Sequence, residues 1–377
     1  MPVLNRRMLG VLALGATLSA CGGGSDDGSD HEDGGDNGGG PVAPVALGQV
    51  VASAWSDTLP QFQNSYSAKE YAGVGASGLI YFRGIEQFGE GYAPVLKQYK
   101  PDGTLVSATR LPISVKDAFP EQIAVLEEQS TDVVLIAVAV AKGSGMINTK
   151  ITAGGYIARL HTPSGEITKL FESSTVCPGG LARDSAGSLY TMDMKTGNVL
   201  RFSPGQNEPS VIYSAKPGAS ASTNVFWDLV FDAKCMVAVT TDGTVYATLS
   251  GAHAASDASY GGYGRQVVRL RNGQADQIKL ALPENEGVIT GLSAHGDSVF
   301  FLSGSGKNTL VRKIDAAGTV STVAGTQGSN AKTEFGSPGV LSWSTQWIDL
   351  TPDGRIHLHG QAQDNPRFYS VLLPANS

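Results

Sequence analysis

The feature that most constrains the fold of this chain is an internal repeat of about 51 residues. Runs with alternating apolar and polar residues are joined by short turns such as PDG (101–103), PSG (163–165) and AAG (316–318), a pattern typical of β-hairpins. Six repeat units start near residues 68, 118, 176, 224, 287 and 340. A four-stranded propeller blade has a similar length, so the sequence predicts an all-β, six-bladed β-propeller of four-stranded antiparallel blades.

The last unit is too short to form a complete blade. It contains strand-like runs near 347–351, 354–359 and 366–373, and then the sequence ends. The segment 46–54 (ALGQVVASA) is extended in character and has no partner of its own. Because an open ring would leave two unpaired sheet edges, we expect this N-terminal segment to be the missing strand and to close the ring.

The fourth unit is the least clear. Between residues 224 and 282 the runs DLVFD, MVAVTT and TVYATLS give one strand more than a blade requires. The pattern alone does not decide which run is omitted.

The stretch 309–339 resembles a junction of the NHL-repeat family. That family has a strand of the type IRKI-D-x-x-G, then V-x-T-x-A-G, and then a loop with a phenylalanine, a proline and a glycine. The corresponding positions here are Val311 to Asp315, Gly318, Val320, Thr322, Ala324, Gly325, Phe335, Pro338 and Gly339. Residues 178–202 repeat the theme, and the resemblance implies a propeller without implying an activity.

The N-terminus has the layout of an export signal. Arg6 and Arg7 precede a short apolar stretch, and the string LSAC ends at Cys21. This string resembles the bacterial lipobox, in which the cysteine is lipidated and becomes the mature N-terminus. The resemblance implies a signal peptide over 1–20 and a membrane anchor at Cys21 in the bacterial cell envelope, and Gly22 favours the outer membrane.

Residues 21–40 form an acidic, glycine-rich segment that we expect to be a flexible tether. The whole chain has a net charge of -7. Without residues 1–40, which carry two arginines and six acidic residues, the net charge is about -3. This balance argues against a nucleic-acid partner. We expect residues 41–377 to form a single propeller domain.

Long insertions are expected on one face of the propeller and tight turns on the other. The insertions at 142–154, 215–224, 251–264 and 326–345 all fall in connections that belong to the same face. Long loops often carry function. The binding-face candidates are the aromatic residues Tyr260, Tyr263, Phe335 and Trp343.

The innermost strands of a propeller line a central channel, and polar residues near them are a second group of candidates. These channel candidates are Trp227, Asp228, Glu286, Trp347 and Asp349. Clustered oxygen ligands suit a hard divalent cation, although channel residues of any propeller also bind water. We predict no cofactor; a channel cation is the alternative.

Two cysteines remain beyond Cys21. Cys177 and Cys235 lie close to the expected inner strands of neighbouring units, so they are disulfide candidates in an oxidising compartment, and a buried reduced pair is the alternative.

The sequence favours an envelope-anchored binding module for an unknown protein or small molecule over an enzyme, because it shows no recognisable catalytic motif. The alternative is a divalent-metal-dependent hydrolase or lyase resembling the gluconolactonase-like propellers. The sequence leaves the ligand, any reaction and the oligomeric state open.

Overall fold

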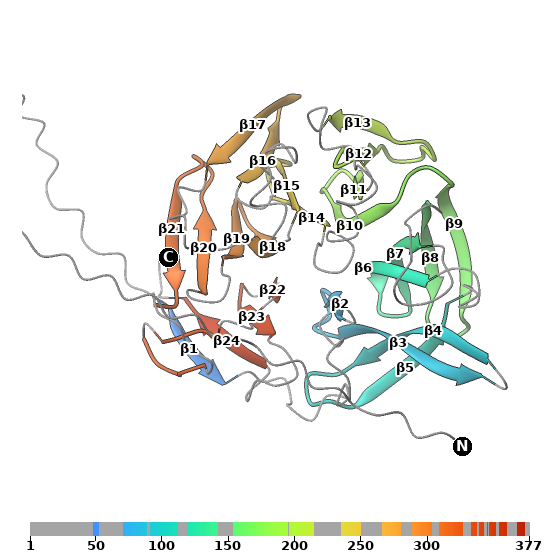
Figure 1. The fold of residues 1–377 in the computed structure, drawn as a ribbon, viewed down its shortest axis with the longest axis horizontal. Coiled ribbons are helices and arrows are strands. Elements are labelled where there is room, and N and C mark those ends of the chain that lie inside the picture. Colours follow the sequence, from blue (N-terminus) through green and yellow to red (C-terminus); the bar gives the residue numbers. More distant parts are fainter. Residues whose placement is uncertain are drawn as a thin grey trace, which may run out of the picture. The chain divides into compact units, whose positions relative to one another are not determined.

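The structure is a computed structural model with six four-stranded antiparallel sheets arranged as blades around a central channel (Figure 1). All described residues belong to the unit Val45–Ser377. They are 48–52, 71–88, 91–111, 119–141, 154–194, 196–214, 235–249, 266–279, 289–303, 309–326, 333–337, 339–342, 345, 347–351, 354–359 and 368–373. Within these residues no helix has the length and apolar character needed to cross a bilayer. The predicted six-bladed propeller is therefore confirmed.

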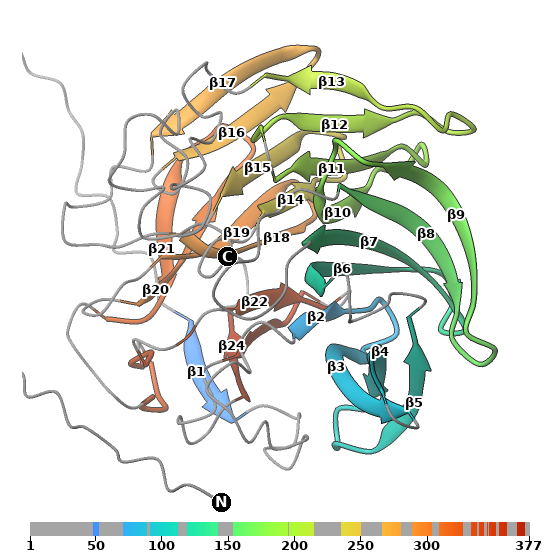
Figure 2. The same cartoon turned by 45° about the vertical axis from the view of Figure 1, so that its right-hand side comes forward.

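The strands of each blade follow one another outward from the channel, as Figures 1 and 2 show. Blade 1 has β2 (Tyr71–Val74), β3 (Ile80–Phe88), β4 (Gly91–Tyr99) and β5 (Leu105–Arg110). Blade 2 has β6 (Phe119–Ser130), β7 (Val133–Ala141), β8 (Gly155–His161) and β9 (Glu166–Ser173). Blade 3 has β10 (Pro178–Arg183), β11 (Leu189–Asp193), β12 (Val199–Phe202) and β13 (Ser210–Tyr213).

The second half of the ring continues the pattern. Blade 4 has β14 (Cys235–Val239), β15 (Val245–Leu249), β16 (Gln266–Arg271) and β17 (Gln274–Lys279). Blade 5 has β18 (Ile289–His295), β19 (Ser298–Ser303), β20 (Leu310–Ile314) and β21 (Val320–Ala324). Blade 6 has β22 (Trp347–Leu350), β23 (Ile356–His359), β24 (Phe368–Leu372) and, last, β1 (Gln49–Ala52).

Blade 4 resolves the surplus strand of the sequence pattern. Its inner strand is β14, which contains MVAV, and its four strands complete the sheet without DLVFD. The inner strand thus starts at Cys235, later than the expected unit start near residue 224. Residues 228–232 lie outside the described residues.

The ring closes as the sequence predicted. Gln49 pairs with Leu372 and Ala52 with Tyr369, so β1 is the outermost strand of blade 6. The other edge of β1 is also covered, because Val50 and Gly336 exchange two backbone hydrogen bonds of 2.7 and 2.9 Å. Both edges of this short strand are therefore paired, which protects a potential aggregation site.

Each seam between neighbouring blades contains its own apolar cluster. The seam between blades 5 and 6 holds Val50 together with Phe300, Leu302 and Ile348. The seam between blades 6 and 1 is aromatic, with Trp347 of β22 packed among Ile80, Phe82 and Tyr99 of blade 1. Burial of aromatic area here stabilises the seam that completes the ring.

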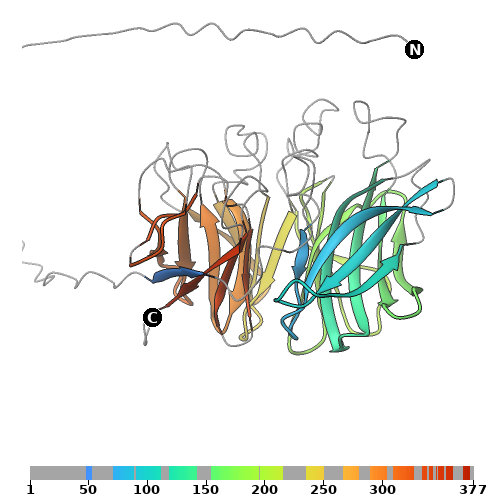
Figure 3. The ribbon, with the colours of Figure 1, turned by 90° about the horizontal axis from the view of Figure 1, so that it is seen from below.

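The turns within the blades define two faces. The hairpins at 75–79, 131–132, 184–188, 240–244, 296–297 and 351–355, which join the first and second strands, lie on one face, here called the short-turn face (Figure 3). Strand ends attached to the segments 142–153, 215–234, 250–265 and 327–346 lie on the opposite face, here called the long-loop face. The predicted segregation of short and long connections is thus present in the strand topology.

We predict that Val50→Asp destabilises the whole propeller. Val50 is fully buried in the cluster between blades 5 and 6, so an aspartate there places a charge in an apolar seam. The expected cost is about 3 kcal/mol or more in the free energy of unfolding, and so a fall of several degrees in the melting temperature. The exposed neighbour Gln49→Asp is the control, and it should melt close to the parent protein. Equal melting of the two variants, measured by circular dichroism, would contradict the closing role of β1.

Candidate functional site

The channel between the six inner strands contains a cavity of about 260 Å³. Every inner strand contributes to its wall, and on each of them consecutive residues line it, as with Gly180 to Arg183 and Ile348 to Leu350. Because successive side chains of a strand point to opposite sides, consecutive lining residues mean that the backbone edge itself faces the cavity. The wall therefore offers peptide dipoles as well as side chains.

Most of the described lining residues are small or apolar, such as Gly73, Ala182 and Ala238. Three of the described lining residues have polar side chains: Arg183 on β10, Ser293 on β18 and Asp349 on β22. The Ser293 hydroxyl accepts a hydrogen bond from the backbone N–H of Leu350 at 3.3 Å, which links blades 5 and 6. Among the lining residues that the structure describes, Arg183 and Asp349 are thus the charged ones.

The position of Asp349 follows from the alternation along β22. Ile348 and Leu350 pack into the cluster between blades 5 and 6. Asp349 therefore lies on the other side of the strand, toward blade 1, where it is partly buried and lines the cavity. Asp349 thus belongs to the cavity wall, and a functional role for it stays a prediction.

The remaining channel candidates have different positions. Trp347, on the same side of β22, packs in the seam between blades 6 and 1 and does not line the cavity. Trp227, Asp228 and Glu286 lie outside the described residues. Within the described part of the chain, no group of three or more His, Cys, Asp and Glu side chains could hold a metal ion.

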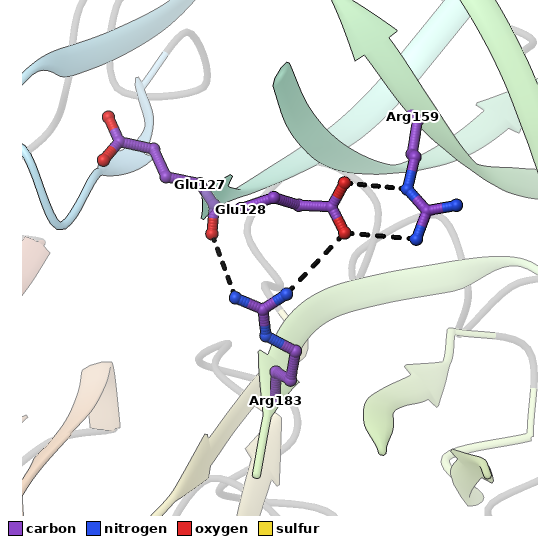
Figure 4. Close-up of polar contacts among 4 residues, drawn as sticks. All are labelled: Glu127, Glu128, Arg159 and Arg183. Atoms are coloured by element: carbon purple, nitrogen blue, oxygen red, sulfur yellow. Dashed lines mark hydrogen bonds and ion pairs between the residues drawn. The ribbon is translucent and has the colours of Figure 1, made fainter. Parts of the chain in front are cut away.

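Arg183 is a cavity residue that sequence reasoning missed. It is the last residue of β10, and its guanidinium group extends toward blade 2 (Figure 4). One nitrogen donates to the backbone oxygen of Glu127 at 3.4 Å, and another lies 3.6 Å from a carboxylate oxygen of Glu128. The one sequence signal for Arg183 is its position at the end of the run GLAR (180–183), directly before the turn DSAG (184–187).

Glu128 is shared between two arginines. Its carboxylate accepts two hydrogen bonds from Arg159 of β8, at 2.7 and 3.3 Å, in addition to the longer contact with Arg183. The hydrogen bond to Glu128 raises the pKa of the Arg159 guanidinium above its ordinary value. Burial of the guanidinium acts in the opposite direction, but its effect is smaller. Glu128 thus faces two guanidinium groups, and one of them, that of Arg183, belongs to a residue that lines the cavity.

The neighbouring Glu127 points the other way, into the seam between blades 1 and 2. Its buried carboxylate accepts hydrogen bonds from the backbone and the hydroxyl of Ser77, at 2.7 and 2.5 Å, and from the Tyr81 hydroxyl at 2.6 Å. Burial, followed by the hydrogen bond to Glu127, raises the pKa of Tyr81 above its ordinary value, so the hydroxyl stays protonated as a donor. A Cβ atom at Gly75 would lie 2.0 Å from the Glu127 carboxyl carbon, so glycine is required there.

Phe335 is the binding-face candidate that the structure describes, in a segment that lies along the outer edge of β1. The residue is 52% exposed, although the residues around it are held by hydrogen bonds. Glu334 pairs with Val340, and Gly336 pairs with Val50. Gly339 has a φ of 66°, and a Cβ atom there would come within 2.5 Å of Val50. Tyr260, Tyr263 and Trp343 lie outside the described residues.

The cysteine candidates lie at equivalent positions of neighbouring blades. Cys177 is fully buried directly before β10, and Cys235 is the first residue of β14, the next inner strand. The side chain of Cys235 is outside the described part, so the disulfide stays a prediction.

Comparisons with solved structures agree with the fold. A protein of unknown function from Bacteroides thetaiotaomicron matches with a TM-score of 0.52 and 14% identity, over 86% of this chain and 76% of that one. An auxiliary nutrient binding protein from the same species matches with a TM-score of 0.49 and 12% identity, over 86% and 76% of the two chains. A gluconolactonase from Xanthomonas campestris matches with a TM-score of 0.47 and 11% identity, over 89% and 98%.

At these identities such likenesses concern the fold alone. No protein-family model matches the sequence, and no curated protein is significantly similar to it. The NHL-repeat resemblance accordingly stays a prediction.

We predict that Glu127→Ala destabilises the propeller more than Glu128→Ala does. The first change leaves the buried Tyr81 hydroxyl without its carboxylate acceptor, which should cost about 2 kcal/mol in the free energy of unfolding. The second removes a pair with Arg159, whose side chain is 49% exposed, and should cost less than about 1 kcal/mol. Urea denaturation of the two variants measures the difference. The reverse order of stability would show that the seam does not depend on Glu127.

Proposed function

We propose that this protein is an envelope-anchored lipoprotein whose propeller binds a ligand or a protein partner through its long-loop face. In this proposal residues 1–20 are removed on export, Cys21 carries the lipid, and the tether over 21–40 links the lipid to the propeller. The partner is a protein or small molecule outside the nucleic acids, and the outer membrane is the expected location.

The segregation of the connections is the observation that carries the proposal. The hairpins that join first and second strands lie on the short-turn face, and the strand ends attached to 142–153, 215–234, 250–265 and 327–346 lie on the opposite face. Long connections often carry function, so the long-loop face is the surface that we propose for the partner.

The chemistry of the long-loop face supports the same function. Phe335 exposes about half of its ring on a hydrogen-bonded loop, so contact with a partner would order few additional groups. Rigid aromatic side chains contribute large contact area at low entropic cost. Tyr260, Tyr263 and Trp343 belong to connections that attach to the same face and would extend this surface.

Site-specific photocrosslinking tests the binding face. A photoreactive phenylalanine analogue at position 335 should form adducts with the partner in intact envelopes. The same analogue at the exposed Ala317, in the turn between β20 and β21 on the short-turn face, is the matched control and should form none. Adducts from position 317 with none from position 335 would assign binding to the opposite face and overturn the proposal.

The anchor is tested separately. We predict that Cys21→Ser abolishes lipidation and moves the protein from the membrane fraction to the soluble fraction, because several acyl chains on one cysteine supply the membrane affinity. Immunoblotting of fractions after a carbonate wash measures the shift. Cys177→Ser, which leaves the lipobox intact, serves as the control. A Cys21→Ser protein that still sediments with membranes would contradict the lipoprotein assignment.

A metal-dependent hydrolase or lyase is the alternative function. The observation that favours it is the carboxylate of Asp349 at the cavity wall, since hard divalent cations take carboxylate ligands. Elemental analysis of the dialysed protein separates the two functions, because the enzyme would retain a stoichiometric divalent cation.

A further inference from the structure

The seam between blades 6 and 1 is the least extensive seam of the ring. Among the clusters that the described residues form, the one in this seam is the smallest, with Ile80, Phe82, Tyr99 and Trp347 buried and Val74 packed against them. Strand β22 also packs much more extensively against β18 of blade 5 than against β2 of blade 1. Because buried apolar area holds neighbouring blades together, we expect the ring to open most easily at this seam.

Blade 6 presents polar side chains to the same seam. The pairing of β22, β23 and β24 places Asp349, His357 and Ser370 opposite one another in one row across the blade. The Ser370 hydroxyl lies 3.2 Å from Nδ1 of His357. His357 and His359 are the buried histidines of the part of the chain that the structure describes. The seam that completes the ring therefore contains side chains of the type that takes up protons near neutral pH.

His359 lies among aromatic side chains. It is the cross-strand partner of Trp347, and its ring meets the ring of Phe82 edge-on, with 6.3 Å between the centroids. The ring of Tyr99 lies 5.8 Å from that of Phe82. Burial, followed by the charge of Glu86, raises the pKa of Tyr99 to about 12, so this phenol stays neutral. A proton on His359 would therefore bring a charge into a largely aromatic seam.

The charged groups that the structure describes at this seam compensate a charge on His359 only weakly. On the side of blade 1 that carries Phe82, Lys97 and Glu86 form an ion pair of 2.8 Å, which is neutral overall. On blade 6, the carboxylate of Asp349 belongs to the residue directly opposite His357. Asp349 therefore balances a charge on His357 better than one on His359.

We propose that protonation of His359 opens the ring at the seam between blades 6 and 1. A histidine in water takes up a proton at about pH 6.5, and moving the resulting charge into apolar surroundings is costly. The closed seam is therefore fully stable above about pH 6.5. Below it the closed seam weakens by about tenfold per pH unit, because opening then takes up one proton.

This opening leads into the channel. Residues of both β2 and β22 line the cavity, so separation of these two strands would make the cavity accessible from the side of the ring. The device depends neither on the binding proposed for the long-loop face nor on the lipid anchor.

Thiol labelling of the full-length protein tests the opening. Ser370→Cys places a thiol in this seam, and Ala247→Cys places one in the seam between blades 3 and 4; both native residues are fully buried. Ile80→Cys, on the blade 1 side, is a second probe that keeps the Ser370 hydroxyl. The reagent 4,4′-dithiodipyridine reacts with thiols at acidic pH, and peptide mass spectrometry separates each position from the native cysteines.

The measured quantity is protection, which is the labelling rate of a thiol in urea divided by its rate in the folded protein at the same pH. Protection at positions 370 and 80 should fall by about tenfold between about pH 6.5 and pH 5.5. Protection at position 247 should change by less than about twofold, because the seam between blades 3 and 4 stays closed.

Two kinds of variant assign the proton. His359→Gln and His359→Phe cannot be protonated, so protection at position 370 should no longer depend on pH. The matched control is His161→Gln, which removes an exposed histidine of blade 2 and should keep the pH dependence of the parent protein. His357→Gln should also keep it, because His357 stands opposite a carboxylate.

The proposal is overturned if protection at positions 370 and 247 falls together, since this would be acid unfolding of the whole ring. It is equally overturned if acid leaves position 370 protected, or if the pH dependence survives in both His359 variants. A dependence that is lost in His357→Gln and kept in His359→Gln would assign the proton to the row of Asp349 instead, and so would also contradict the proposal.

Discussion

Every blade of this propeller depends on its two neighbours for its apolar core. The buried clusters lie in the seams, as with Tyr81 and Ile136 between blades 1 and 2, and Tyr246 and Phe301 between blades 4 and 5. A blade alone would leave both of its faces in water, and the area buried at each seam is the main favourable contribution to folding. The ring must therefore close for any blade to be complete, and the channel is a consequence of that closure.

Polar contacts add specificity to the seams of blade 2. Two consecutive residues of β6 point in opposite directions, with Glu127 bonded to Tyr81 of blade 1 and Glu128 facing Arg183 of blade 3. Alternation along a strand makes this arrangement available wherever two acidic residues adjoin. The same alternation leaves Arg183 at the edge of the channel with only partial pairing. A contact that orients two blades thus also places a charged residue at the edge of the channel.

The fold was largely predictable, because the repeat length and the tight turns are local signals. Even the long-range pairing of β1 could be predicted, since blade 6 lacked one strand. Blade 4 was harder, because DLVFD and CMVAV have the same β character, and the sequence alone does not decide which of them belongs to the four-stranded sheet that contains β14. The candidate site was less predictable. Asp349 and Trp347 belong to one short strand, yet only packing against the neighbouring blades decides that the first lines the cavity and the second fills a seam.

The closing strand also imposes an order in time. β1 ends at Ala52, and its partner β24 begins at Phe368, with the strands of all other blades between them. A chain that is synthesised or exported from its N-terminal side therefore produces β1 first, and this strand cannot pair until the strands of blades 1 to 5 have followed. Until then Val50 lacks both the apolar cluster between blades 5 and 6 and its backbone pairing with β24. Blade 1 likewise lacks its packing against Trp347 of blade 6. The appearance of β24 is thus the event that commits this protein to its native ring.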